Sequence, residues 1–364
     1  MSDTRSILSR VRVLIVDDSA FMRTSLSRMI ASAPDFEVVG TASNGTMALE
    51  KIESLDPDVV TLDVSMPGMD GVATLRCIMS RFPRPVIMVS AATERNAEST
   101  LAALSAGAFD YVHKQMSSTS LEITHIRSDL IAKIRAAARS RRSMPTDSPA
   151  KKPPSSATRN NLSPLSSLAV VAIGASTGGP GALQEILPQL PPDFSLPILV
   201  VQHMPPGYTA AFAQRLNQLC SIPVREPTQS EVVRPGVIYV AGAGRHMRIV
   251  RQRHDSVVIS LDSHPDDAPH IPSIDVLMES VAECFATRSL GVILTGMGAD
   301  GAQGIAAIFR QGGVTIGQDE GSCVVYGMPR VCAERGVLSR VLPLSQIAPQ
   351  ILQLTRCRMR ASAG

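Results

Sequence analysis

The chain has 364 residues, of which 44% are hydrophobic and 18% charged, a composition typical of a globular protein large enough for two domains. A formal charge of +3 and an aromatic content of 3% provide neither a basic face nor stacking platforms, which excludes nucleic-acid binding. No apolar run reaches the roughly 18 residues of a membrane span, and the six cysteines are scattered without a C-x-x-C pair. We therefore expect a cytoplasmic protein without membrane insertion, disulfides or a zinc site.

Five short apolar runs alternate with amphipathic helical patterns over residues 1–138. The runs cover residues 13–16, 37–40, 59–62, 86–89 and 108–112. Alternation of strand and helix over five units predicts an α/β domain with a doubly wound parallel sheet.

Polar side chains stand where these predicted strands end. Asp17 and Asp18 come after the first run and Asp63 after the third, while Ser90 and Lys114 come after the fourth and fifth. Because parallel strands bring their carboxyl ends to one sheet edge, we expect these side chains to meet there. Three converging carboxylates repel one another unless a divalent cation lies between them, and oxygen ligands suit Mg²⁺. Taken singly, Asp17 and Asp18 could cap a helix, and Lys114 could be a solvated surface residue.

This half resembles the receiver domain of two-component response regulators over about residues 11–135, on that constellation and on the run Asp63-Val64-Ser65-Met66-Pro67-Gly68-Met69-Asp70-Gly71. The resemblance implies that Asp63 is the phosphoacceptor and a histidine kinase the phosphodonor. The implied ligands and contacts are Asp17, Asp18, Asp63 and the Ser65 carbonyl for Mg²⁺, Ser90 and Lys114 for the phosphate, and Tyr111 as the switch aromatic. Gln115 stands where the family usually has proline, so the loop carrying Lys114 is expected to differ.

Residues 139–166 differ in composition from the segments on either side. They contain five prolines and many serines with almost no large apolar side chains, so they cannot offset the entropy of ordering. Six of the 35 Lys and Arg residues lie here against one acid, which leaves the rest of the chain close to neutral. We predict a flexible linker between a domain at 1–138 and a second domain at 167–364.

The second domain has its own alternation, which predicts a larger Rossmann-like parallel sheet. Its expected strands lie near residues 169–173, 198–202, 237–241, 257–261, 291–295 and 313–317. The first of them leads into Gly174-Ala175-Ser176-Thr177-Gly178-Gly179, which fits the G-x-S-x-G pattern of a turn that presents a nucleophile.

A serine nucleophile needs a base and a group that orients the base. His203 follows one predicted strand, and Asp300 follows the glycine-rich turn after another. We predict that Ser176 attacks, that His203 is the general base and that Asp300 orients it. A strand-end histidine can also be structural, and Asp300 could cap a helix. The order Ser-His-Asp differs from that of α/β-hydrolases, so we expect the same chemistry on another fold.

Two other interpretations compete with a hydrolase. Residues 296–301 fit G-x-G-x-x-G after a strand, with Asp319 and Glu320 about 20 residues further on, which outlines a dinucleotide site. Such a site would leave Ser176 and His203 without a role. The chain could also be a phosphorylation-dependent binding protein with an inactive second half, and the intact Ser176, His203 and Asp300 argue against that.

From about residue 168 to 355, the chain resembles the chemotaxis protein-glutamate methylesterase family. The resemblance rests on residues 174–179, 202–207, 272–275, 294–301 and 322–329, and on the order of receiver, linker and esterase. It implies phosphorylation-regulated hydrolysis of glutamate methyl esters, and deamidation of specific glutamines, on cytoplasmic helices of chemoreceptors. The implied site residues are the triad Ser176, His203 and Asp300, an oxyanion donor near Met297, and Thr177, Arg245 and His246 lining the site.

The two-domain layout predicts how the esterase is controlled. The ester hydrolysis needs no metal, since Mg²⁺ belongs to the receiver. We expect a monomer in which the unphosphorylated receiver covers Ser176 and phosphorylation of Asp63 exposes it. Ala268, Pro269 and Ile271 stand where the family commonly has an asparagine and a basic residue, so substrate contacts there are expected to differ.

Overall fold

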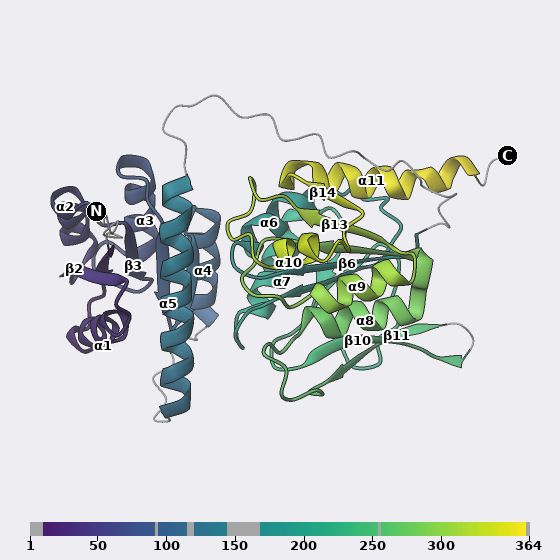
Figure 1. Ribbon diagram of the computed structural model, residues 1–364, viewed down its shortest axis with the longest axis horizontal. Helices are drawn as coiled ribbons and strands as arrows, with labels where there is room; N and C mark the ends of the chain where they lie inside the picture. Colours follow the sequence, from purple (N-terminus) through teal and green to yellow (C-terminus); the bar gives the residue numbers. More distant parts are fainter. Residues whose placement is uncertain (1–9, 92–93, 115–119, 144–167, 254–255, 362–364) are drawn as a thin grey trace, which may run out of the picture. The chain divides into compact units, whose positions relative to one another are not determined.

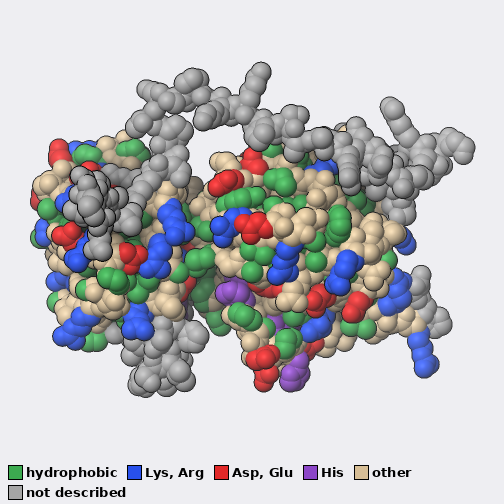
Figure 2. Space-filling model, viewed as in Figure 1, with side chains coloured by type: hydrophobic (Ala, Val, Ile, Leu, Met, Phe, Trp, Pro, Cys, Tyr) green, Lys and Arg blue, Asp and Glu red, His purple; other side chains and the backbone are tan. Residues whose placement is uncertain are grey.

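Two compact units make up this computed structural model, one over residues 1–144 and the other over 145–364. The structure describes residues 10–91, 94–114, 120–143, 168–253 and 256–361, and each unit is described by itself (Figure 1). Within those residues, no helix is long and apolar enough to cross a lipid bilayer. On the face of the second unit shown in Figure 2, acidic and basic side chains are interspersed rather than gathered by sign.

The first unit is built around a five-stranded parallel sheet in the order β2-β1-β3-β4-β5. Its strands are β1 (Val11–Val16), β2 (Phe36–Ala42), β3 (Val59–Asp63), β4 (Val86–Ser90) and β5 (Asp110–His113). Its helices are α1 (Ala20–Ala31), α2 (Gly45–Leu55), α3 (Gly71–Arg81), α4 (Glu94–Ser105) and α5 (Ser120–Ser143). Helix α1 contacts α5, whereas α3 contacts α2 and α4, so the helices form two groups. The predicted doubly wound sheet is confirmed.

Buried strands and polar caps explain why these elements form. Every residue of β3 and β4 is buried, as expected for a parallel sheet covered on both faces. Ser19, Asn44 and Asp70 precede α1, α2 and α3, and each side chain accepts a hydrogen bond from the backbone N–H three residues on. The strand order reverses between β1 and β3, which is where ligands bind in such folds.

Helix α5 extends beyond the boundary expected from the sequence. It ends at Ser143, so residues 139–143 are helical and the predicted linker start at 139 is wrong. Alanine and arginine are strong helix formers, and Ala137 and Ala138 are buried, so the helix continues until Pro145 disfavours a helical residue before it. The rest of the predicted linker lies outside the described residues.

A seven-stranded parallel sheet forms the second unit, in the order β14-β13-β12-β6-β7-β9-β8. Its strands are β6 (Val170–Ala175), β7 (Ile198–Gln202), β8 (Val224–Arg225), β9 (Ile238–Val240), β12 (Ser289–Ile293), β13 (Val314–Gln318) and β14 (Arg340–Leu342). Strand β6 pairs with both β12 and β7. The loops that follow these three strands therefore begin side by side at the centre of one sheet edge. The larger parallel sheet predicted for this half is confirmed.

Two groups of helices cover this sheet. They are α6 (Gly179–Ile186), α7 (Thr209–Leu219), α8 (Ile274–Phe285), α9 (Ala302–Arg310), α10 (Met328–Glu334) and α11 (Leu344–Ala361). Helix α8 lies beside α9 and packs on β6, while α6 contacts α7 and α11 (Figure 1). Leu277 and Met278 of α8 and Ile305 of α9 belong to the buried core on their side of the sheet.

The apolar run at 257–261 belongs to a separate hairpin rather than to the predicted sheet. Strand β10 (His246–Arg251) pairs antiparallel with β11 (Val257–Asp262). Met247 and Ile259 are buried in the core that includes α8, so burial alone made this run look like a sheet strand. Strands β8, β10 and β14 were not predicted, because they are short or mix arginine with apolar residues.

Candidate phosphoacceptor and active sites

Three carboxylates gather where the strand order of the first unit reverses. Asp17 and Asp63 are buried and Asp18 is exposed, and one carboxylate oxygen of each lies within 4.8 Å of the others. The Nζ of Lys114 lies 2.8 Å from Asp17 Oδ2 and 2.8 Å from Asp63 Oδ2. The structure thus brings the predicted acidic residues together, with the lysine between the two buried ones.

The charges around Asp63 act in opposite directions. Burial raises the pKa of the Asp63 carboxyl; Lys114 opposes this shift, and the neighbouring Asp17 adds to it. A divalent cation bound here would favour the ionised carboxyl. Carboxylate oxygens at this spacing are the hard ligands that Mg²⁺ prefers, so the residues fit the predicted metal.

Ser65 and Ser90 lie beside this cluster. The Ser65 N–H donates to Asp63 Oδ1 at 3.2 Å. Ser90 is fully buried at the end of β4, and its Oγ accepts a hydrogen bond from Thr100 Oγ1 at 2.9 Å. Asp63 pairs with Val89, the residue before Ser90, so both predicted residues lie close to Asp63.

Tyr111, the predicted switch residue, is buried in β5. The Nζ of Lys133 lies 5.3 Å from the centroid of its ring. Gln115, which replaces the usual proline, lies outside the described residues.

In the second unit, Ser176 stands directly after β6 in a tight turn. Its N–H donates to the Thr295 carbonyl at 3.1 Å, and its own carbonyl accepts from the Gly179 N–H at 2.8 Å. Gly178 has a φ of 75°, a left-handed conformation that favours glycine. A Cβ on Gly296 would lie 2.8 Å from Ser176 Cβ, so glycine allows that loop to approach the predicted nucleophile.

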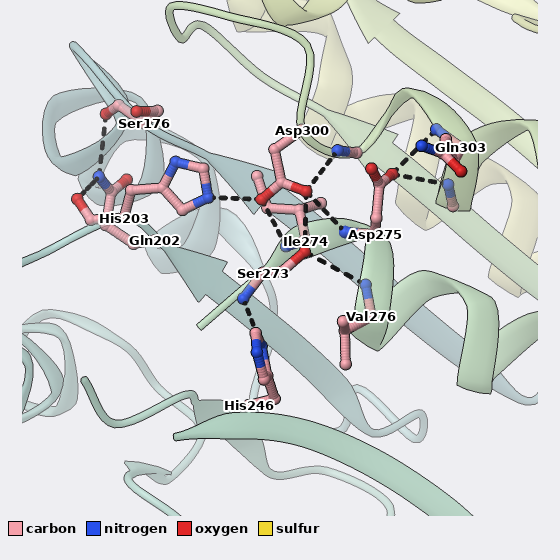
Figure 3. Close-up of polar contacts among 12 residues, drawn as sticks. Ser176, Gln202, His203, His246, Ser273, Ile274, Asp275, Val276, Asp300 and Gln303 are labelled. Atoms are coloured by element: carbon pink, nitrogen blue, oxygen red, sulfur yellow. Dashed lines mark hydrogen bonds and ion pairs between the residues drawn. The ribbon is translucent and has the colours of Figure 1, made fainter. Parts of the chain in front are cut away.

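His203 and Asp300 form a direct pair. His203 Nε2 lies 2.7 Å from Asp300 Oδ2, and in Figure 3 the imidazole lies between Ser176 and Asp300. His203 Nδ1 is buried and has no hydrogen-bond partner among the described residues. The nitrogen that is available to a serine hydroxyl is therefore Nδ1.

The Asp300 carboxylate accepts four further hydrogen bonds. The donors are Ser273 Oγ at 2.9 Å and the backbone N–H groups of Ile274, Asp275 and Gly301 at 2.8, 3.1 and 3.0 Å. Three of these donors belong to the start of α8, where backbone N–H groups favour a negative charge. Burial by itself would raise the pKa of Asp300, but His203 and the backbone donors hold it below its ordinary value.

Sequence reasoning assigned no role to Gln202, Ser273 or Asp275. Ser273 caps α8 and Asp275 Oδ1 accepts from two N–H groups of α9, so both hold the loop that carries Asp300. The Gln202 side chain bonds to the backbone carbonyl of Ser176 (Figure 3). A serine before an apolar helical pattern is a detectable capping signal, whereas a single glutamine at a strand end carries none.

His246 lies behind Asp300 rather than at the surface of the site. It is fully buried, its Nδ1 accepts from the Ser273 N–H at 3.0 Å, and its Nε2 lies 3.0 Å from the Pro265 carbonyl. These partners define a neutral ring with the proton on Nε2. His246 thus contacts the loop of Ser273, which in turn contacts Asp300.

The other predicted site residues, Thr177, Met297 and Arg245, differ in how exposed they are. Thr177 is buried and its carbonyl accepts from Thr295 Oγ1, Met297 is half-buried in the loop beside Ser176, and Arg245 is exposed. His270, which unlike His203 does not follow an apolar run and is therefore the weaker candidate for the base, stacks on His203 with ring centroids 4.0 Å apart.

The alternative dinucleotide site is not supported by the contacts of its residues. The glycine-rich turn at 296–301 presents Asp300 to His203. Asp319 accepts hydrogen bonds from the N–H and the Oγ of Ser322, so it holds its own loop.

Known proteins resemble most of this chain. Family models for the CheB methylesterase and the response regulator receiver domain match residues 171–351 and 13–125. A Nitratidesulfovibrio vulgaris protein named protein-glutamate methylesterase/protein-glutamine glutaminase 2 is 43% identical, over 94% of this chain and 98% of its own. A Symbiobacterium thermophilum protein named protein-glutamate methylesterase/protein-glutamine glutaminase is 46% identical, over 94% and 96%.

A solved structure resembles the second unit. The catalytic domain of the Thermotoga maritima CheB methylesterase matches with a TM-score of 0.50 and 39% identity, over 52% of this chain and 100% of that one. The folds and the family models define a response regulator whose second unit is an α/β esterase-type domain. The chain belongs to the CheB methylesterase family.

Proposed function

We propose that this protein hydrolyses glutamate methyl esters on chemoreceptors and deamidates specific receptor glutamines, under the control of its receiver. The observation that carries the proposal is the His203–Asp300 pair beside Ser176. Family membership and the names of the relatives support the same chemistry.

The contacts of His203 support one route for the proton. Because Asp300 holds Nε2, Nδ1 accepts the proton as Ser176 Oγ attacks the ester carbonyl. The tetrahedral intermediate collapses when the protonated ring returns this proton to the leaving methoxide, which departs as methanol. Water then attacks the acyl-serine with His203 as base, which releases the glutamate carboxylate and restores Ser176. Deamidation follows the same steps with ammonia as the leaving group.

The negative oxygen of the intermediate needs hydrogen-bond donors. The Ser176 N–H already donates to Thr295, so it does not serve as one. We assign this role to backbone amides near Met297, because Gly296 brings their loop against Ser176. A donor of this kind lowers the barrier by about 3–4 kcal/mol. Thr177 and Arg245 remain proposed contacts at the rim.

The receiver takes its phosphoryl group on Asp63, with a histidine kinase as the donor. Asp17, Asp18, Asp63 and the Ser65 carbonyl would hold Mg²⁺, which supplies positive charge to the transferring phosphoryl group. Lys114 and Ser90 contact the phosphate on Asp63, and Tyr111 responds to it. In the unphosphorylated state the receiver inhibits the esterase.

The Ser176→Ala variant, assayed for receptor demethylation, tests the esterase assignment. Full-length protein is incubated with methyl-labelled receptors, with and without a phosphodonor, and released methanol is counted. The variant should release none while Asp63 is still phosphorylated, because the two sites lie in different units. Methanol release at the rate of the unaltered protein would exclude Ser176 as the nucleophile.

A further inference from the structure

Gln202 connects the segments that carry the proposed nucleophile and base. It is the last residue of β7 and only 2% exposed. Its Nε2 donates to the Ser176 carbonyl at 2.9 Å and to the His203 carbonyl at 3.1 Å (Figure 3). One side-chain amide thus bonds to the backbone of both residues.

The Gln202 amide lies just beyond the last backbone hydrogen bond that joins the two segments. The His203 N–H donates to the Ala175 carbonyl at 3.1 Å, which is the last backbone bond between β6 and β7. Beyond it, the chains of Ser176 and His203 turn away into separate loops. The Gln202 amide therefore continues the connection one step past the end of the ladder.

The residues around Gln202 leave room for its side-chain amide but do not satisfy all of its hydrogen bonds. A Cβ on Gly179 would lie 2.0 Å from Gln202 Oε1, so only glycine leaves room for the amide. Gln202 Oε1 is buried and has no hydrogen-bond partner among the described residues, which is unfavourable for folding. Methionine would fill a similar volume and would remove this unpaired oxygen, but it would also remove the two hydrogen bonds of Nε2. Because these effects on stability oppose one another, we expect their sum to be small.

We propose that Gln202 is a positioning residue that sets the distance between the Ser176 hydroxyl and His203 Nδ1. This inference rests on the proposed function, since it assumes that these two atoms exchange a proton. Loss of the Nε2 donor removes the link between the Ser176 and His203 carbonyls, and the Ser176 carbonyl keeps only its bond from the Gly179 N–H, so the two segments can shift relative to one another. Displacements of about 1 Å reduce rates by about 100-fold when reacting groups must be aligned.

The test is Gln202→Met in the full chain, treated with Mg²⁺ and a small-molecule phosphodonor. A fluorophosphonate probe reports the rate at which Ser176 is labelled, and receptor demethylation gives kcat and KM. We expect labelling and kcat to fall about 10- to 100-fold with KM unchanged, while the midpoint of thermal unfolding changes little. A purely structural role predicts the opposite pattern, a lower midpoint with normal labelling.

Gln350→Met is the matched control. Gln350 is also buried, and its amide bonds to Arg340 and Gln353 in and beside α11, away from the esterase residues. Its labelling rate should equal that of the unaltered protein. Gln202→Glu keeps the side-chain length but places a carboxylate opposite two carbonyls, so this variant should lose at least as much activity as Gln202→Met. It replaces Gln202→Met in the experiment if the methionine variant does not fold.

Three outcomes overturn the inference. Normal labelling of Gln202→Met would exclude a positioning role, and so would equal losses in Gln202→Met and Gln350→Met. Failure of the unaltered, phosphorylated protein to label at Ser176 would instead contradict the proposed function, and the role of Gln202 with it.

Discussion

Asp300 and Asp275 cap each other's helices. Asp300 accepts hydrogen bonds from the N–H groups of Ile274 and Asp275 at the start of α8, and Asp275 accepts from Gln303 and Gly304 at the start of α9. The end of the loop that carries Asp300 is thus held between the N-termini of α8 and α9. Such anchoring preorganises the carboxylate that faces His203.

Asp300→Asn should reduce kcat for ester hydrolysis by about 10³- to 10⁴-fold, because the amide cannot stabilise a protonated His203. Receptor demethylation and probe labelling measure the loss. Asp193→Asn, at an exposed acid before β7, is the control and should keep full activity. Less than a tenfold loss in Asp300→Asn would contradict the assigned role.

Ser273→Ala removes the α8 cap and one donor to Asp300. We expect a loss of about 1 kcal/mol in unfolding free energy and a several-fold lower kcat with unchanged KM. Ser273→Thr keeps the hydroxyl and should recover most of both. Chemical denaturation and steady-state kinetics on the three proteins measure these effects, and equal kcat values would show that Asp300 does not need this donor.

Burial raises the pKa of Asp275 from 3.8 to about 6, with Asp300 and Glu279 as further causes. Between these values the folded chain holds a proton that the unfolded chain has released, so stability should fall as pH rises from about 4 to about 6. Asp275→Asn cannot titrate, and its amide oxygen still accepts from α9. The unfolding midpoint of the variant, measured across this pH range, should therefore not show that decline. An unchanged profile would mean that another group causes it.

Lys114→Ala should increase the affinity of the receiver for Mg²⁺ several-fold. The Lys114 ammonium lies between Asp17 and Asp63 and competes with a cation for their oxygens. Titration calorimetry measures the affinity, and activation by a phosphodonor should be lost in the same variant. Lys51→Ala is the control, because Lys51 bonds to the Thr41 carbonyl instead. Weaker Mg²⁺ binding after Lys114→Ala would indicate that the lysine helps to shape the site.

A chain that begins at residue 167 should hydrolyse receptor esters faster than the unphosphorylated full chain, because it lacks the proposed inhibition by the receiver. We expect this segment to fold alone, because it lies in a compact unit of its own and resembles a catalytic domain from Thermotoga maritima. The full chain with Asp63→Asn should hydrolyse receptor esters at the rate of the unphosphorylated full chain, with or without a phosphodonor. Equal rates for the short chain and the unphosphorylated full chain would exclude inhibition.

The alternation of apolar runs and helical patterns was sufficient to predict both parallel sheets. It also placed Asp17, Asp63, Ser176 and His203 at strand ends, because a parallel sheet brings all its carboxyl ends to one edge. These predictions need only local periodicity and one rule of topology. The arginines and serines at residues 139–143 resemble a linker in composition, although these residues continue α5.

Contacts between distant segments could not be predicted in this way. Three features depend on how β6, β7 and α8 pack. They are the ring nitrogen of His203 that faces Asp300, the hydrogen bond from the Gln202 amide to the Ser176 carbonyl, and the mutual capping of Asp275 and Asp300. The partners are 97, 26 and 25 residues apart in the chain, so no local pattern relates them. Local sequence therefore specifies which groups reach the sheet edge, and long-range packing specifies which atoms meet there.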